Sequence, residues 1–241
     1  MLTNSEKIRY TRQILLFKEE NQIKLKGAKI FVAGVGGLGC PASMYLAVAG
    51  IGKIKIIDKD RVDLSNLNRQ VLHWEKDINK AKVSSAIEKL KSINPDIEIE
   101  AIDGEITEEN AISLINGCDG IFDAMDNFET RFILNKVALD LKIPLFHGSI
   151  YGLEGRATTI IPGRTVCLNC IFREAPPKET FPVIGTTPGL IAMIQATEVI
   201  KYFTSLGKLL ENRYFIYNGI DMTFRELKLK KDPDCLVCGV K

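Results

Sequence analysis

The sequence has no excess of either charge, few cysteines, and no long apolar run that is free of helix breakers. Its 32 lysines and arginines against 30 aspartates and glutamates leave a formal charge of +2, which does not favour nucleic acid or an anionic membrane as a partner. Six cysteines in 241 residues are too few for a disulfide scaffold. The uncharged stretches 30–52 and 180–197 both contain glycines and prolines, which argue against membrane-spanning helices.

The N-terminal segment MLTNSEKIRYTRQ lacks the apolar core of an export signal, so we expect a cytoplasmic protein. The composition, 46% hydrophobic and 26% charged, is that of a globular chain long enough for one sizeable core. Disorder is therefore excluded as the main state of the chain.

Strand-like and helix-like segments alternate through the first 150 residues, as in βαβ units with a parallel sheet. Strands are predicted over 30–34, 53–58, 97–103, 120–125 and 144–149, and helices over 40–49, 80–93, 107–116 and 127–141. The segment 154–162 then continues as a strand without an intervening helix, so the sheet acquires antiparallel members. A helix over 190–205 and strands over 213–219 and 223–230 follow. We predict an α/β, Rossmann-like mixed sheet with helices on both faces.

The motif GVGGLG, Gly34 to Gly39, follows a predicted strand and opens a predicted helix. Glycines permit a tight turn and close approach of a phosphate, and the helix N-terminus offers unpaired N–H groups. Asp58 ends the next strand, where a carboxylate can accept hydrogen bonds from ribose hydroxyls. These features predict a nucleotide site and leave NAD, FAD, S-adenosylmethionine and ATP open; glycines that serve only helix packing are the alternative.

Cations near this motif favour a triphosphate. Arg69, in SNLNRQ (65–70), and Lys82 could neutralise its charge, and Asp126 could hold Mg²⁺. Exposed arginines and lysines usually only solvate a helix face. These residues, however, follow the carboxyl ends of consecutive strands, where open α/β sheets bind ligands.

Several motifs, in order and over nearly the whole chain, resemble the MoeB/ThiF/HesA adenylyltransferases, which are relatives of the ubiquitin-activating enzymes, and the pattern is closest to the molybdopterin-synthase adenylyltransferases. The motifs are RYTRQ (9–13), GVGGLGCPAS (34–43), the D-x-D at Asp58 and Asp60, SNLNRQ (65–70), the Lys82 segment, AMDN (124–127) and two C-x-x-C pairs. The resemblance implies one adenylation domain over 1–241, with a nucleotide-binding part at 1–150 and a zinc-containing, carrier-binding part at 151–241.

The resemblance also implies that ATP and Mg²⁺ activate the C-terminal glycine carboxylate of a ubiquitin-like sulfur carrier that ends in Gly-Gly. The acyl adenylate would serve molybdopterin, thiamine or related sulfur transfer, with a sulfurtransferase or cysteine desulfurase as a further partner. Activation of a peptide C-terminus or a tRNA carboxylate stays open. So do an NAD-binding oxidoreductase and a non-catalytic scaffold that binds a ubiquitin-like protein.

Each site residue is carried over by its position in a matching motif. Glycines 34, 36 and 37 would line the nucleotide, and Asp58 would hold the ribose, with Asp60 beside it. Asn66, Arg69 and Lys82 would contact the phosphates, and Asp126, next to Asn127, would coordinate Mg²⁺. Arg12 matches an arginine that reaches into the partner's phosphate site in homodimers of the family. Arg12, Arg69, Lys82 and Asp126 form the predicted catalytic set.

Cys167, Cys170, Cys235 and Cys238 can supply four thiolates to a closed, structural zinc site; redox dithiols or idle thiols are the alternatives. Some relatives use a cysteine in the irregular loop before the C-terminal helix to bind the carrier covalently. The corresponding stretch 176–189 has none, which favours adenylation alone, and we expect it to order over the carrier's tail. Cys40, Cys118, His73, His147 and Trp74 are expected to be structural.

Overall fold

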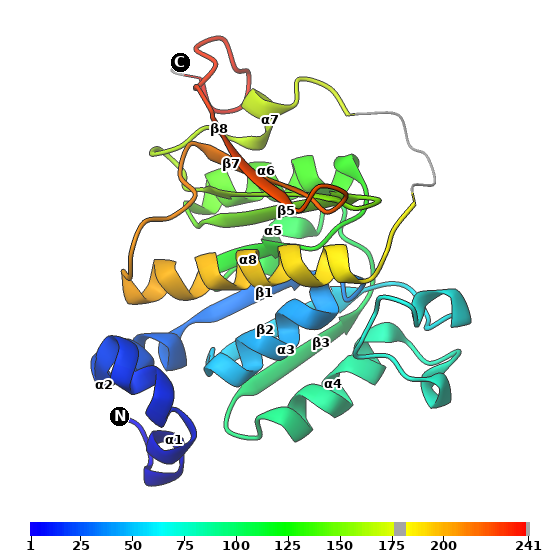
Figure 1. The fold of residues 1–241 in the computed structure, drawn as a ribbon, viewed down its shortest axis with the longest axis vertical. Coiled ribbons are helices and arrows are strands. Elements are labelled where there is room, and N and C mark those ends of the chain that lie inside the picture. Colours follow the sequence, from blue (N-terminus) through cyan, green and yellow to red (C-terminus); the bar gives the residue numbers. More distant parts are fainter. Residues whose placement is uncertain (176–181, 240–241) are drawn as a thin grey trace.

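A computed structural model describes residues 1–175 and 182–239 of the chain (Figure 1). Its sheet has eight strands in the order β3-β2-β1-β4-β5-β6-β7-β8. Neighbouring pairs from β3 to β5 are parallel, and those from β5 to β8 are antiparallel. The strands are β1 (Lys29–Ala33), β2 (Lys53–Asp58), β3 (Glu98–Asp103), β4 (Gly120–Asp123), β5 (Leu145–Tyr151), β6 (Glu154–Ile160), β7 (Arg213–Asn218) and β8 (Thr223–Lys228). The predicted mixed sheet is confirmed.

Helices cover both faces of this sheet, as predicted. They are α1 (Asn4–Arg9), α2 (Thr11–Gly27), α3 (Gly39–Ala49), α4 (Lys82–Ile93), α5 (Ala111–Ile115), α6 (Phe128–Leu141), α7 (Leu168–Ile171) and α8 (Thr186–Thr204), with short 3₁₀ turns η1 (Leu64–Asn66) and η2 (Glu75–Asp77). None of the helices in the described ranges is both long and apolar enough to span a membrane.

The core consists of two apolar clusters, one on each face. Successive residues of a strand point to opposite faces, so Ile30 and Val32 of β1 join a cluster with α3, α4 and α8, whereas Phe31 and Ala33 join one with α5 and α6. A strand buried on both sides reads as a continuous apolar run. This is why KIFVA could be recognised in the sequence.

The chain reverses its direction across the sheet between β1 and β4. From β1 it proceeds outward to β2 and β3, then returns to β4 on the other side of β1. Such a switch point leaves a crevice beyond the carboxyl ends of the two strands. The glycine turn follows β1 at this point, and Gly34 adopts a φ of +94°, which favours glycine.

Some elements differ from the sequence prediction. The helix expected over 107–116 is shorter, α5 beginning only at Ala111, and α8 begins at Thr186 instead of 190. Pro188 is tolerated there because the first turn of a helix needs no N–H partner at that position. The prediction assigned no element to the first 28 residues, which form α1 and α2, nor a helix to the single turn α7.

Candidate functional site

The glycine turn after β1 is fixed from both sides through Val35. The N–H of Val35 donates to Asp58 Oδ2 (2.8 Å), which ties the turn to the end of β2. Its carbonyl accepts a hydrogen bond from His73 Nε2 (2.9 Å), and the other ring nitrogen of His73 pairs with Ser85 (3.0 Å). Gly36 and Gly37 remain half-buried at the rim. The turn is therefore held in place while its apex stays accessible to a ligand.

The predicted carboxylates and Lys82 lie together at the end of β2. Asp58 Oδ1 accepts the N–H of Asp60 (2.9 Å). Lys82 Nζ lies 2.8 Å from Asp60 Oδ2 and 4.0 Å from Asp58 Oδ1, and its side chain is only 6% exposed. The positive charge of Lys82 is thus fixed beside the glycine turn before any ligand binds.

Arg69 and Asn66 come from the loop between β2 and α4. Arg69 Nη1 donates to Ser65 O (2.9 Å) and Asn68 Oδ1 (2.8 Å), and its Cδ lies 3.6 Å from where a Cβ on Gly37 would be. Arg69 therefore reaches the glycine turn. The side-chain oxygen of Asn66 instead accepts the N–H of Asp63 (3.2 Å) and so completes the capping box of η1, whose N-cap is Asp63.

Asp126 is exposed, three residues after the end of β4. The backbone leading to it borders the glycine turn, because Ala124 and Met125 are the nearest neighbours of Gly34. Asn127 Oδ1 caps α6 by accepting the N–H of Thr130 (2.9 Å). An exposed carboxylate at this point fits Mg²⁺, which commonly takes one or two carboxylates together with water and substrate phosphates.

Arg12 is not brought to this group of residues within one chain. It is exposed on α2, whose preceding residue Tyr10 packs against Gly50 and accepts a hydrogen bond from Asn94 (2.8 Å). Gly50 is the C-cap of α3 and precedes β2, so α2 lies at the amino ends of the strands, whereas the glycine turn lies at their carboxyl ends (Figure 1).

Two buried groups near the turn, His73 and Cys40, have pKa values shifted in favour of their neutral forms. Burial lowers the pKa of His73 and raises the pKa of the Cys40 thiol to about 12. His147 also has its pKa lowered by burial and pairs with Asp123. The expectation that both histidines and Cys40 are structural agrees with these contacts, whereas Cys118 is only half-buried.

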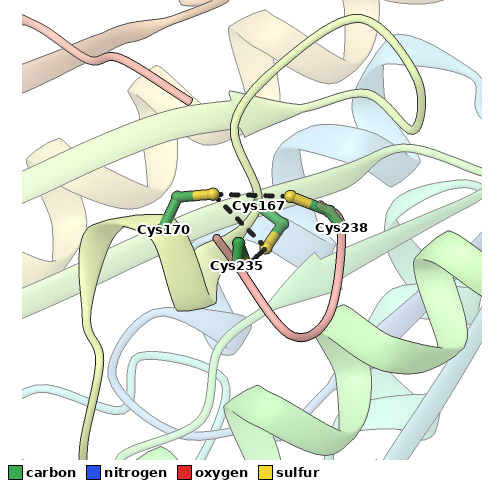
Figure 2. A group of neighbouring side chains, drawn as sticks. All are labelled: Cys167, Cys170, Cys235 and Cys238. Carbon is green, nitrogen blue, oxygen red and sulfur yellow. Dashed lines mark hydrogen bonds between the residues drawn. The ribbon is translucent and has the colours of Figure 1, made fainter. Parts of the chain in front are cut away.

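The four cysteines of the two C-x-x-C pairs converge (Figure 2). Three of the distances between their Sγ atoms are 3.9 Å for Cys167–Cys170, 3.7 Å for Cys167–Cys235 and 3.4 Å for Cys170–Cys238. A tetrahedral zinc ion with Zn–S bonds of about 2.3 Å separates its sulfurs by about 3.8 Å. The cluster therefore fits zinc, which would join α7 to the segment after β8.

The stretch 176–189 is described only in part, because residues 176–181 lie outside the described ranges. The described part, residues 182–189, packs beside the glycine turn. Gly152 N donates to Pro182 O (2.8 Å), and Gly37 faces Pro188, whose ring carbons lie 3.4 Å from a Cβ position on that glycine. The described residues of the loop that we expect to cover the carrier's tail thus lie next to the glycine turn.

Sequence reasoning did not single out three buried polar residues at the site. Gln70 lies beside Gly36, Arg131 pairs with Asp123, and Gln195 donates to two strand carbonyls. Gln70 and Gln195 lie against backbone that is distant in sequence, and Arg131 also donates to the carbonyls of Met125 and Gly148. In the sequence, the one feature that could have drawn attention to these residues is that they follow, or lie opposite, the end of a predicted strand.

Residues 10–237 match the ThiF family. The chain is 40% identical to the SAMP-activating enzyme E1 of Haloferax volcanii, over 96% of this chain and 88% of that protein. It is 35% identical to the sulfur carrier protein adenylyltransferase of Thermus thermophilus, over 98% and 92%. The adenylyltransferase and sulfurtransferase MOCS3 of Anopheles gambiae is 42% identical, and the match spans 56% of that longer protein.

Solved structures of Escherichia coli MccB have the same fold. One, with MccA-N7isoASN, superposes with a TM-score of 0.88 at 25% identity, covering 99% of this chain and 76% of MccB. Another holds ATP and has a TM-score of 0.86, covering 95% and 74%.

Proposed function

Because the chain belongs to the ThiF family, we propose that it uses ATP to adenylylate the C-terminal carboxylate of a small ubiquitin-like sulfur carrier. The names of the two relatives that match over nearly their whole length support this substrate class. The observation that carries the proposal is the placement of Asp58, Lys82 and Arg69 around one glycine turn at the switch point of the sheet. Family membership favours this activity over an NAD-binding oxidoreductase or a scaffold.

Asp58 is suited to the ribose. Each of its carboxylate oxygens accepts one backbone N–H, from Val35 and Asp60, which fixes its orientation and leaves lone pairs for hydroxyl donors. Gly34, Gly36 and Gly37 then let the α-phosphate approach the backbone, with the N-terminus of α3 behind it.

In the reaction, the carrier carboxylate attacks the α-phosphorus of ATP, the bond to the β-phosphate oxygen breaks, and pyrophosphate leaves. The carboxylate is itself the nucleophile, so the protein needs no catalytic base. Lys82 and Arg69 stabilise the negative charge that develops on the phosphates. To contact the phosphates, the Lys82 ammonium must give up part of its ion pair with Asp60.

Mg²⁺ bound at Asp126 would neutralise phosphate charge. Asp126 and Asn127 follow β4, whereas Lys82 begins α4 after β2, and these two strands flank β1 in the sheet. Zinc in the four-cysteine cluster would have no open ligand position, so its contribution is structural.

The finer assignments are also proposals. Within one chain Arg12 belongs to α2, at the amino ends of the strands and away from the glycine turn. In a homodimer like those of the family it would reach the site of the other subunit. The partners would be a carrier ending in Gly-Gly and a sulfurtransferase or cysteine desulfurase in molybdopterin, thiamine or related sulfur transfer, all in the cytoplasm. The absence of a cysteine from 176–189 favours adenylation without a covalent carrier intermediate.

A peptide C-terminus is the second candidate, favoured by the likeness to MccB solved with MccA-N7isoASN. Exchange of labelled pyrophosphate into ATP distinguishes the two substrates. We expect exchange with an intact carrier ending in Gly-Gly and none with the carrier lacking those glycines or with its free tail peptide. Equal exchange with the peptide would favour the second candidate, and no exchange with any carrier would overturn the proposal.

A further inference from the structure

Arg131 carries a buried charge near the carboxyl ends of the parallel strands, and the proposed chemistry gives it no role. It lies in the first turns of α6 and is only 5% exposed. Its Nη2 donates to Met125 O (2.6 Å) and Gly148 O (3.2 Å), and its Nε lies 3.6 Å from Asp123 Oδ2. One guanidinium therefore connects the carboxyl end of β4, the turn that follows it, and β5.

The partner carboxylate, Asp123, is fully buried and holds the same turn. Its Oδ1 accepts the N–H of Met125 (3.1 Å), and its Oδ2 accepts from His147 Nδ1 (2.6 Å). Met125 is thus fixed at its N–H by Asp123 and at its carbonyl by Arg131. The next residue along the chain is Asp126.

A purely structural role explains this arrangement poorly. Taking two charges out of water is costly, and apolar residues of similar size often fill such a position at no loss of stability. Asn135, one turn further along α6, provides a comparison, since it accepts the N–H of Leu168 (2.9 Å) beside the cysteine cluster and stabilises that segment without a charge. The buried ion pair instead lies where the backbone leads to the proposed magnesium ligand.

We propose that Arg131 is a positioning residue, which, together with Asp123, fixes the peptide before Asp126 so that the Asp126 carboxylate meets magnesium-bound triphosphate. The proposal rests on the proposed function, because it takes Asp126 as the magnesium ligand. In this proposal Arg131 itself contacts neither Mg²⁺ nor ATP. Its guanidinium acts through the Met125 carbonyl.

The test measures binding of the non-hydrolysable ATP analogue AMPCPP by calorimetry at increasing Mg²⁺. Arg131→Lys keeps the charge but lacks the planar guanidinium, so it cannot donate to the Met125 and Gly148 carbonyls and lie against Asp123 in the same geometry. We expect the Mg²⁺ concentration needed for half-maximal binding to rise about tenfold, as for other residues that orient a metal ligand, while binding without Mg²⁺ is unchanged. Asn135→Ala should keep the wild-type Mg²⁺ requirement although its melting temperature falls.

Asp126→Ala should remove the Mg²⁺ dependence, and Arg131→Lys should add nothing to it in the double variant. A folded Arg131→Lys protein with the wild-type Mg²⁺ requirement would overturn the proposal, as would an Asp126→Ala protein with unchanged dependence. If Arg131→Lys does not fold, Asp123→Asn must raise the Mg²⁺ requirement in the same way. Failure of the proposed function would differ, since the wild-type protein would then show no pyrophosphate exchange with carrier.

Discussion

Lys82 and Arg69 differ in how firmly the chain holds them before a nucleotide binds. The ammonium of Lys82 is nearly buried between two carboxylates, whereas Arg69 is half-buried and bonded to a backbone carbonyl and an amide oxygen of its own loop. Lys82 therefore presents a pre-oriented charge. Arg69 can turn toward the phosphates without breaking a buried ion pair.

Lys82→Ala and Arg69→Ala should each lower pyrophosphate exchange about 10²–10³-fold, the usual cost of losing one group that stabilises developing charge. Both variants should keep the wild-type circular dichroism spectrum. Lys91→Ala is the matched control, because Lys91 is exposed in the last turn of the same helix as Lys82. Near-native exchange in both site variants would remove these residues from the mechanism.

Asp77 makes stability depend on acid pH. Burial alone would raise its pKa, but hydrogen bonds from Lys89, Lys80 and the Trp74 N–H hold the pKa of Asp77 well below its usual range. A carboxyl whose pKa is lowered on folding stabilises the protein above its unfolded pKa of about 3.9, and this stabilisation is lost as pH falls toward the folded value.

Asp77→Asn should lower the free energy of unfolding at pH 7 by about 3–5 kcal/mol, because it leaves Lys89 buried without its partner. Denaturant titrations should show the difference from wild type shrinking as pH falls below about 4. Glu88→Gln, which removes only exposed pairs with Lys76 and Lys80, should cost at most about 1 kcal/mol. A constant difference across this pH range would contradict the assignment.

Sequence could predict those site residues that follow strand ends and belong to recognisable motifs. The structure brings Asp58, Asp60 and Lys82 together because β2 has the predicted bounds and α4 begins two residues after the predicted start, at Lys82 itself. Arg131 could not be selected, and Gln70 received no role although it lies in the SNLNRQ motif, since the contacts of both depend on which backbone groups the fold places beside them. Asn66 is selected by its motif as a phosphate ligand, but in the structure its side chain accepts the N–H of Asp63 in a local turn.

At the scale of elements, buried strands and amphipathic helices were predictable because their periods are distinct. The N-terminal helices were not, since α2 leaves Leu15 and Leu16 exposed and breaks its helical backbone at Lys18, where φ is +67°. Such a conformation is rare outside glycine. The pattern of residues in that region therefore does not define a single buried face.

The cysteine cluster joins two elements that are far apart in sequence, α7 and the segment after β8 (Figure 2). We expect metal analysis to find about one zinc per chain, and Cys238→Ser to lower the melting temperature by about 5 °C or more, since a structural metal contributes directly to folding. Cys118→Ser is the control, because Cys118 lies outside the cluster. Zinc-free protein with unchanged stability would disprove the metal site.

At the scale of the whole molecule, the proposed homodimer, in which Arg12 reaches the partner's site, predicts complementation between subunits. Arg12→Ala and Lys82→Ala homodimers should each retain only about 10⁻²–10⁻³ of wild-type exchange. In a mixed dimer, however, the subunit with intact Lys82 receives Arg12 from its partner. Random pairing makes half of the dimers mixed, each with one complete site, so coexpression should restore about a quarter of wild-type exchange. If Arg12 acts within its own chain, no activity will return.

The central claim is that a foreign carboxylate attacks ATP at the switch point between β1 and β4. It is tested most directly by comparing pyrophosphate exchange with a carrier ending in a free glycine carboxylate and with the same carrier ending in a carboxamide. We predict exchange with the carboxylate and none with the amide, because the amide cannot form the acyl adenylate. Equal exchange with both carriers would contradict the account.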